Sequence, residues 1–204
     1  MTRLITFVAF GDSLTVGFIP SRIATQPYSQ FLKDMVDDFL KQLEKDSAIK
    51  VRFINRGVNG DLTSVMLVRF RKDVIQLNPQ YVIILGGAND LGWGFPVEEI
   101  FLNLQRMYEM ALENKVKPIA CTVPSIIGWD EGIPQRMRLN QSIKQYCSEK
   151  GILVADLFSK TCDTETKRLR SEHSSDGLHL NTLGYRKIAE SIYEEVVKDL
   201  LLTN

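Results

Sequence analysis

Ser13 stands directly after an apolar run and is the first residue in the chain that could carry chemistry. Residues 4–10 are apolar except for Thr6, and the run ends on Gly11-Asp12-Ser13. Such a run predicts a strand buried on both faces at the centre of a parallel sheet. A hydroxyl at the carboxyl end of a central strand lies where open α/β sheets bind ligands. Two interpretations stay open here: a nucleophile, or a cap for the helix that follows.

A serine nucleophile needs a base, because a free serine hydroxyl is scarcely ionised near neutral pH. The chain has two histidines, His173 and His179, and Asp176 precedes His179 by three residues. This spacing lets the Asp176 carboxylate fold back onto Nδ1 of the His179 ring within one turn. It would fix the ring tautomer and stabilise the imidazolium that forms during attack. His173 lies in a charged loop, and we predict that it is a surface residue.

Gly60 and Asn89 are candidate hydrogen-bond donors, because each follows a predicted strand. Gly60 can offer its backbone N–H with no side chain in the way, and Asn89 can offer its amide NH₂. Taken singly, each is typical of a turn. Together with Ser13 and the Asp176–His179 pair, they would be the parts of an acyl-transfer site: nucleophile, base, orienting acid and oxyanion donors.

Further apolar segments predict the strands that would position these residues. They are 51–54, 81–85, 117–123 and the shorter 152–155. Between them, apolar residues recur at helical spacing and predict amphipathic helices. These helices are expected over 28–43, 61–77 with Asp61 as its cap, 97–112, a segment through 139–147 that ends at 151, and 182–200.

Strands that alternate with helices imply parallel strands joined by right-handed crossovers, with helices on both faces. We therefore predict an α/β fold, a three-layer α/β/α sandwich of the flavodoxin-like type with a central, mostly parallel five-stranded sheet. A length of 204 residues predicts one domain over 1–204. In such a sheet Ser13, Gly60 and Asn89 all fall at the carboxyl edge.

Composition excludes several classes of partner. Lys plus Arg equals Asp plus Glu, at 25 each, so no net field recruits nucleic acid or an anionic membrane. No apolar run reaches the roughly 18 residues of a membrane span. No small-residue cleavage site precedes Gly11, which favours a strand over an export signal. The cysteines, Cys121, Cys147 and Cys162, are odd in number and far apart, which is typical of reduced thiols in a cytoplasmic protein.

In four separate blocks the sequence resembles the GDSL family of serine esterases and lipases, also called SGNH hydrolases. The blocks are Gly11-Asp12-Ser13-Leu14, residues 55–63 around Gly60, Gly87-Ala88-Asn89-Asp90 and Asp176-Gly177-Leu178-His179. They occur in family order, at family-like spacing and across nearly the whole chain. One tetrapeptide is weak support for a family, whereas four blocks that each follow the expected strand are strong support.

The resemblance implies a serine-dependent carboxylic ester hydrolase with a covalent acyl-enzyme. Ser13 would attack the ester carbonyl, with His179 as base and then acid and Asp176 orienting it. The N–H groups of Ser13 and Gly60, with the Asn89 amide, would hold the oxyanion. The resemblance implies no metal and no organic cofactor, and the expected partner is a small-molecule ester. Compact length without an apparent lid favours short-chain, acetyl-type esters of a soluble substrate.

Two alternatives remain open. Lysophospholipase or thioesterase activity on longer acyl chains lies within the family's range. A non-catalytic flavodoxin-like binding module would share the layered sheet, but no Gly-x-Gly-x-x-Gly follows the first strand and no Walker lysine occurs. Such a module would also have no use for the Asp176–His179 pair. We expect no stable membrane association, and the sequence does not determine the oligomeric state.

Three further features have two interpretations each. Trp93 and Trp129 fall in loops after the third and fourth strands, where each either walls the substrate pocket or packs beneath its loop. The segment Lys167–Arg170 carries a basic cluster, which is either a solvated loop or a neighbour of an anionic substrate group.

Overall fold

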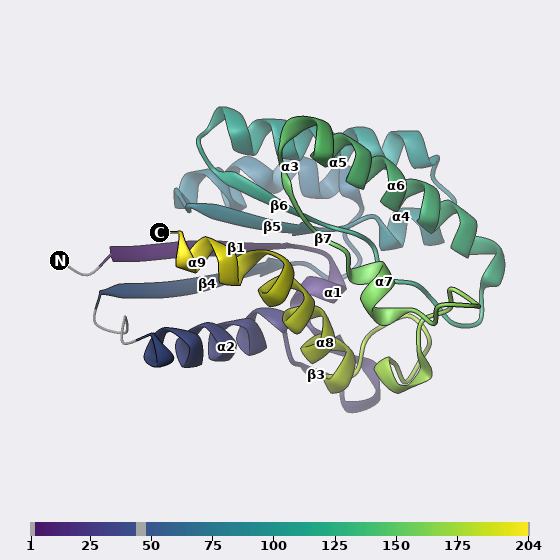
Figure 1. The fold of residues 1–204 in the computed structure, drawn as a ribbon. Coiled ribbons are helices and arrows are strands. Elements are labelled where there is room, and N and C mark those ends of the chain that lie inside the picture. Colours follow the sequence, from purple (N-terminus) through teal and green to yellow (C-terminus); the bar gives the residue numbers. More distant parts are fainter. Residues whose placement is uncertain (1–2, 44–47, 204) are drawn as a thin grey trace.

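A five-stranded sheet forms the centre of the computed structural model, which describes residues 3–43 and 48–203. The strand order is β4-β1-β5-β6-β7 (Figure 1). Each neighbouring pair is parallel, so the predicted three-layer sandwich with a parallel five-stranded sheet is confirmed. The strands are β1 (Arg3–Gly11), β4 (Ile49–Gly57), β5 (Tyr81–Leu85), β6 (Lys117–Cys121) and β7 (Leu153–Ala155).

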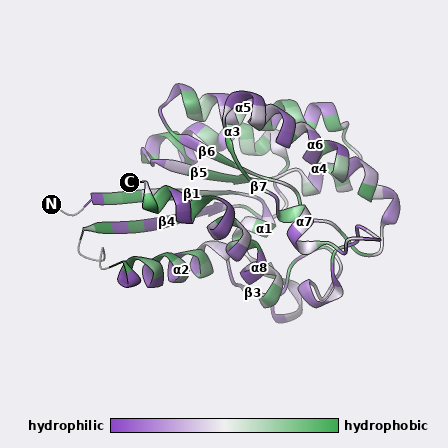
Figure 2. Ribbon diagram, in the orientation of Figure 1, coloured by the Kyte–Doolittle hydropathy of each residue, from purple (hydrophilic) through white to green (hydrophobic). Residues whose placement is uncertain are grey.

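Helices cover both faces of this sheet (Figure 1). One face is covered by α3 (Thr63–Asp73), α5 (Val97–Glu113) and α6 (Ile133–Lys150). The other is covered by α2 (Tyr28–Gln42), α8 (Thr182–Ile192) and α9 (Lys198–Leu202), with the π-helical turn η5 (Tyr193–Val197) between the last two. Figure 2 shows hydrophobic residues along β5 and β6 and alternating hydrophobic and hydrophilic bands along α2.

The helical spacing of apolar residues in α2 produces its buried side. Most side chains that repeat every three or four positions are buried, and Met35 and Phe39 on the same side are partly buried. The buried apolar set is Tyr28, Phe31, Leu32, Val36 and Leu40. The same reasoning fixes which face of each long helix meets the sheet.

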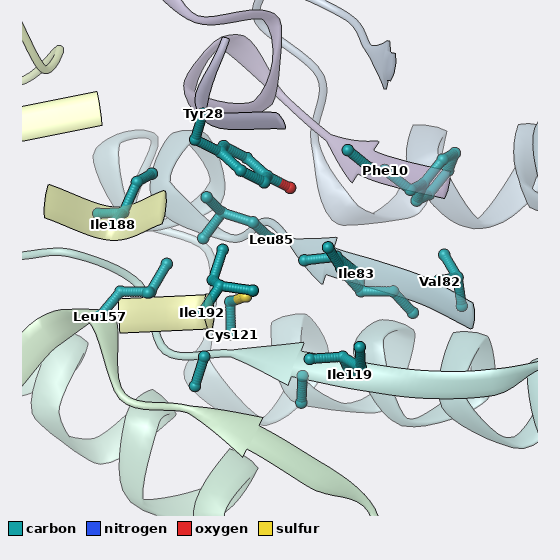
Figure 3. Close-up of a cluster of buried hydrophobic side chains, with 14 of the residues drawn as sticks. Phe10, Tyr28, Val82, Ile83, Leu85, Ile119, Cys121, Leu157, Ile188 and Ile192 are labelled. Atoms are coloured by element: carbon teal, nitrogen blue, oxygen red, sulfur yellow. The ribbon is translucent and has the colours of Figure 1, made fainter. Parts of the chain in front are cut away.

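The core is densest where the middle strands meet the helices. The Phe7 ring on β1 stacks between Phe53 and Tyr81, at centroid distances of 5.0 and 4.7 Å. Burial of such side chains contributes roughly 1.5–3 kcal/mol each to the hydrophobic stabilisation. Figure 3 shows a second part of this core, where side chains of β5, β6, α2, α8 and the short helix α7 (Leu157–Thr161) meet: Tyr28, Val82, Ile83, Leu85, Ile119, Cys121, Leu157, Ile188 and Ile192.

Several short elements at the carboxyl edge of the sheet were not predicted, because periodicity needs longer segments. They are α1 (Ser13–Val16), the hairpin of β2 (Phe18–Ile19) and β3 (Ala24–Thr25), α4 (Ala88–Gly92) and α7 (Leu157–Thr161). The predicted helix 61–77 is also divided, since α3 ends at Asp73 and a 3-10 turn, η2 (Ile75–Leu77), follows.

His173 is buried, so its prediction as a surface residue is wrong. Only 8% of its surface is exposed, and its Nδ1 lies 3.3 Å from the carbonyl oxygen of Thr161. The polar segment 159–175 folds back on itself, with a bridge between Cys162 and Leu169, and the turn that holds His173 packs on α8. The charged residues next to His173 in the sequence are therefore a poor predictor of its exposure.

Two findings concern partners and thiols. Among residues 3–43 and 48–203, no helix has both the length and the apolar character needed to cross a bilayer. Cys121, Cys147 and Cys162 are all buried and free.

The strand register brings three loops together at one edge of the sheet. Gly11, at the end of β1, pairs with Gly57 of β4 on one side and with Leu85 of β5 on the other. Ser13, Gly60 and Asn89 follow these three strand ends within a few residues, and α1 and α4 lie at this edge (Figure 1). The sheet therefore positions all three sequence blocks side by side.

Candidate active site

Ser13 is the first residue of α1, at the carboxyl end of the central strand β1. Asp12 caps this short helix, because its Oδ1 accepts a hydrogen bond from Leu14 N–H at 2.9 Å. Glycine is required at position 11, since a Cβ there would overlap the Leu85 carbonyl oxygen and the Thr15 hydroxyl. Ser13 is buried in this tightly packed turn, with 7% of its surface exposed.

His179 and Asp176 form the expected pair. Nδ1 of His179 lies 2.8 Å from Asp176 Oδ2, while Asp176 Oδ1 accepts the backbone N–H groups of Leu178 and His179 at 3.0 and 2.7 Å. The ring edge of Phe18, the residue that begins β2 after α1, packs against the imidazole at a centroid distance of 5.3 Å. Carboxylate and aromatic ring together fix the orientation of His179.

The protonation state of Asp176 follows from these contacts. Partial burial raises its pKa, but the hydrogen bonds from the His179 ring and from the two backbone N–H groups outweigh burial, so the net pKa is lowered. An ionised Asp176 accepts a proton-bearing Nδ1 and leaves Nε2 of His179 with its lone pair. The ring is therefore in the tautomer that a general base requires.

Within the described residues, the side chain of Ser13 forms no hydrogen bond with His179. Structures without substrate often have long contacts between nucleophile and base, which tighten when substrate binds. The His179 ring contacts Phe18, which follows α1 in the chain and whose carbonyl oxygen accepts a hydrogen bond from Tyr185 Oη at 2.9 Å.

Three hydrogen-bond donors at this edge lack acceptors. The backbone N–H groups of Ser13 and Gly60 donate to no residue in the described part of the chain. Gly60 has a φ of +77° and open space where a Cβ would stand, so its N–H is accessible. Asn89 donates through Nδ2 to the Asp61 carbonyl oxygen at 2.9 Å, which orients the amide and leaves its second N–H free. This arrangement suits an oxygen that becomes negatively charged.

Arg69 on α3 joins the loops that carry these donors. Its Nε donates to Asp61 Oδ2 at 2.6 Å, its Nη2 to the Gly11 carbonyl oxygen at 2.8 Å, and its Nη1 to the Arg56 carbonyl oxygen at 3.0 Å. The guanidinium also lies over the Phe10 ring, 4.2 Å from its centroid. Sequence analysis missed this residue, because nothing in the local pattern distinguishes it from Arg71 beside it.

The helix cap expected from Asp61 is wrong. Asp61 pairs with Arg69 instead, and the cap of α3 comes from Asp90, which follows a different strand. Asp90 accepts Thr63 N–H at 3.0 Å and the Thr63 hydroxyl at 2.6 Å. Asp90 thereby ties α4, which carries Asn89, to the start of α3.

A hollow of about 320 Å³ opens beside Asn89. Trp93 is 79% exposed and forms part of its wall, and Leu178, directly before His179, forms another part. The full lining is Ala88, Asn89, Gly92, Trp93, Ile126, Arg136 and Leu178. Larger hollows elsewhere, such as one of about 620 Å³ between α6 and α7, are lined by none of the residues discussed above as donors or catalytic groups.

Trp129 and the basic segment Lys167–Arg170 form contacts within the protein and do not line the hollow beside Asn89. Trp129 does not line the hollow beside Asn89; it packs on a small apolar cluster that includes Ile126 and Phe158. In the basic segment, Arg168 Nε donates to Asp130 Oδ1 at 2.8 Å, and Arg170 Nε donates to the Cys162 carbonyl oxygen at 3.2 Å. Lys167 Nζ bonds the carbonyl oxygen of Thr164 at 2.6 Å, so these cations brace their own loop.

As to metals, the described residues hold no group of three or more His, Cys, Asp or Glu side chains placed to bind an ion. The Ser13 hydroxyl and the three N–H donors follow strand ends at one edge of the sheet, and Leu178, directly before His179, lines the same hollow as Asn89. Such a set of groups is suited to acyl transfer.

Comparison with known proteins agrees with this geometry. Residues 9–187 match the model of the GDSL-like Lipase/Acylhydrolase family. An arylesterase of Vibrio mimicus is 26% identical, with 95% of this chain and 88% of that protein covered. An acetylxylan esterase of Geobacillus stearothermophilus is 24% identical, with 72% of each chain covered. The solved lipase/acylhydrolase of Enterococcus faecalis is 25% identical, with 96% of each chain covered and a TM-score of 0.76.

Some curated relatives are longer. N-acylneuraminate cytidylyltransferases of Streptococcus agalactiae match at 23% to 26% identity, and the chain spans only 34% to 41% of their length. The family match, by contrast, covers most of this chain, and esterases match it across most of their own length. The chain therefore belongs to the GDSL-like lipase/acylhydrolase family.

Proposed function

We propose that the protein hydrolyses short-chain, acetyl-type esters through a covalent acyl-enzyme on Ser13. The observation that carries this proposal is the 2.8 Å contact between His179 Nδ1 and Asp176, which leaves Nε2 as a base. Residues 1–204 would act as one catalytic domain without a metal or organic cofactor. The buried, free cysteines favour a reducing compartment, so we place the protein in the cytoplasm.

In the first half-reaction His179 Nε2 takes the Ser13 Oγ proton as Oγ bonds to the ester carbonyl carbon. The carbonyl oxygen becomes an oxyanion, which accepts hydrogen bonds from Ser13 N–H, Gly60 N–H and the free N–H of Asn89. The carbon–oxygen bond to the alcohol then breaks, and His179 returns the proton to the departing alcohol.

In the second half-reaction His179 takes a proton from water as the water oxygen bonds to the acyl carbon. The acyl–Oγ bond breaks, the carboxylic acid leaves, and the proton returns to Ser13. Asp176 stays ionised throughout and stabilises the transient imidazolium. Every proton that leaves an oxygen therefore passes through one imidazole.

The substrate class rests on two observations. An arylesterase and an acetylxylan esterase are among the relatives, and their names describe esters with aryl alcohols and acetyl groups. The hollow beside Asn89 is about 320 Å³, a size that suits a small substituent better than a long acyl chain. A small-molecule ester is thus the expected partner, without nucleic acid and without stable membrane association.

The test is hydrolysis of 4-nitrophenyl acetate by wild type, Ser13→Ala and Ser142→Ala, in which a half-buried serine on α6 is the matched control. Ser13→Ala should lower kcat by several orders of magnitude with unchanged circular dichroism, while Ser142→Ala keeps wild-type rates. Mass spectrometry after a fluorophosphonate should find the adduct on Ser13. Near wild-type turnover by Ser13→Ala would overturn the serine mechanism.

A chain-length series of 4-nitrophenyl esters, from acetate to laurate, tests the acyl group. Under the proposal kcat/KM falls as the chain lengthens. A maximum at eight or more carbons, on the order of ten-fold above acetate, would instead assign the lysophospholipase or thioesterase type of activity, because each buried methylene favours binding by roughly 0.8 kcal/mol.

A further inference from the structure

Arg136 is a buried charged residue in the wall of the hollow beside Asn89. It projects from the first turns of α6, and only 1% of its surface is exposed. The hollow is also lined by Leu178, which directly precedes His179, and by Trp93. Arg136 therefore borders the space between the proposed oxyanion donor and the loop of the proposed base.

The guanidinium of Arg136 is incompletely satisfied. Nη1 donates to the Pro124 carbonyl oxygen at 3.2 Å, whereas Nε and Nη2 have no hydrogen-bond partner among the described residues. Burial lowers the pKa of Arg136 to about 10, so it stays protonated at neutral pH. A buried cation with unpaired donors is costly, and such groups in native proteins are normally paired with protein, water or ligand.

The acidic group near Arg136 does not offset the free-energy cost of burying its guanidinium. Asp12 is the acid whose field reaches Arg136, and the two groups form no direct hydrogen bond. Burial raises the pKa of Asp12 to about 7, so near neutral pH its carboxyl is only partly ionised. The remainder of the hollow is lined by uncharged side chains, including Ala88, Ile126 and Leu178.

We propose that Arg136 recognises a carboxylate on the ester that this protein hydrolyses. The inference rests on the function proposed above and adds the class of substrate. Nε and Nη2 lie on one edge of the planar guanidinium, so they can donate in parallel to the two oxygens of a carboxylate. The favoured substrates are acyl esters of hydroxy acids or monoesters of dicarboxylic acids, with the anionic group in an otherwise uncharged hollow.

Two pairs of esters test this inference, one for each half of the substrate. 4-Acetoxybenzoate carries its carboxylate on the alcohol, and 4-isopropylphenyl acetate is its uncharged isostere. Monomethyl succinate carries its carboxylate on the acyl group, and methyl 4-methylpentanoate is its uncharged isostere. The readout is the ratio of kcat/KM between charged and uncharged members, for wild type, Arg136→Met, Arg136→Lys and Arg138→Met.

In one of the two pairs, Arg136→Met should lower the charged-to-uncharged ratio by about 10- to 100-fold, the loss expected for hydrogen bonds to a charged group. Arg136→Lys keeps the charge but not the fork, so its ratio should fall less. Arg138→Met is the control, since this exposed arginine of α6 pairs with Glu98. It should keep the wild-type ratio. Equal loss for both members of both pairs would overturn the proposal and reduce Arg136 to a structural cation.

A binding measurement separates this inference from the proposed function. Titration calorimetry of 4-acetoxybenzoate and of monomethyl succinate into Ser13→Ala, with and without Arg136→Met, needs no turnover. If no ester is hydrolysed but one carboxylate ester binds and Arg136→Met abolishes its binding, the carboxylate site stands and the esterase proposal fails. If hydrolysis occurs and neither ester binds better than its isostere, the carboxylate site fails alone. If circular dichroism shows that the protein with Arg136→Met does not fold, Arg136→Lys takes its place in this binding measurement.

Discussion

At the scale of single residues, the two histidines have opposite surroundings. His179 has Asp176 on one ring nitrogen, and the other ring nitrogen has no hydrogen-bond partner among residues 3–43 and 48–203. His173 is enclosed by its own loop, and its ring nitrogen faces the Thr161 carbonyl oxygen. The first arrangement suits proton transfer, because the base is both oriented and accessible, whereas the second stabilises a loop. The Asn89 amide shows a similar contrast, because one N–H is bound to the Asp61 carbonyl oxygen and the other is available to the proposed oxyanion.

Asn89 provides the prediction at this scale. Asn89→Ala should lower kcat for 4-nitrophenyl acetate by about 10²–10³-fold, because the lost N–H meets full negative charge only in the tetrahedral state. KM should change much less. Asn89→Asp should be at least as harmful, since an ionised carboxylate cannot donate.

The same preparation must also give a melting temperature, since Asn89 Nδ2 holds the Asp61 carbonyl oxygen. A residue that only stabilises a turn would lower the melting temperature and leave kcat per folded molecule unchanged. That outcome would contradict the role in the oxyanion hole.

At the scale of elements, the site depends on strand ends that share one guanidinium. Arg69 on α3 bonds the end of β1 through the Gly11 carbonyl oxygen and the end of β4 through the Arg56 carbonyl oxygen. Its ion pair with Asp61 holds the residue that follows Gly60, and the Asp61 carbonyl oxygen accepts the Asn89 amide. Arg69 thus supports the segments of Ser13 and Gly60 directly and that of Asn89 through Asp61.

Arg69→Met should therefore lower kcat by about 10- to 100-fold, because displacement of donors by roughly 1 Å is costly in rate. KM should change little. Arg71→Met, on the same helix and exposed, is the control and should keep wild-type kcat. Rates are measured well below the melting temperature of each variant.

A double variant distinguishes positioning from general destabilisation. If Arg69 acts through the oxyanion donors, Arg69→Met should cost less in the Asn89→Ala background than in wild type. Strict additivity of the two losses would assign Arg69 to stability alone.

At the scale of the whole molecule, the parallel sheet places a carboxyl group in the interior. Asp12 is fully buried beside the proposed nucleophile, and its Oδ2 has no hydrogen-bond partner among the described residues. Burial is the main cause that raises its pKa from 3.8 to about 7, and the charges of Asp90 and Asp61 add to it against the Leu14 N–H bond. Between pH 3.8 and about pH 7, the folded protein therefore keeps a proton on Asp12 that the unfolded chain has released.

This proton linkage makes unfolding free energy depend on pH. A raised carboxyl pKa means that the stabilising contribution is complete below about pH 4, falls as pH rises toward 7, and is lost above it. Asp12→Asn removes the titrating group and keeps an oxygen that can accept Leu14 N–H. Urea unfolding at pH 4.5 and 7.5 should show that the variant gains stability relative to wild type at the higher pH, by an amount on the order of a few kcal/mol. An equal difference at both pH values would show that Asp12 does not titrate in this range.

The sequence alone predicted the layered fold and the candidate residues of the site. Long apolar strands and amphipathic helices carry their own period, so β1, β5 and α2 could be predicted with nearly correct bounds. The Asp176–His179 pair could be predicted too, because three residues of separation fix its geometry locally. Ser13, Gly60 and Asn89 were found because the parallel topology brings the ends of successive strands to one edge.

Tertiary structure alone decided which groups support that site and which do not. Asp90 bonds a residue 27 positions away and Arg69 one 58 positions away, whereas Arg136 has unpaired donors inside the fold. The sequence neighbours of these residues reveal none of this. The surface prediction for His173 was wrong for the same reason, and the sequence left two interpretations open for Trp129, since burial depends on how a loop folds back and not on its composition. Periodicity and short-range geometry follow from the local amino-acid sequence, whereas the partner of a buried charge depends on which distant segments the packed core brings together.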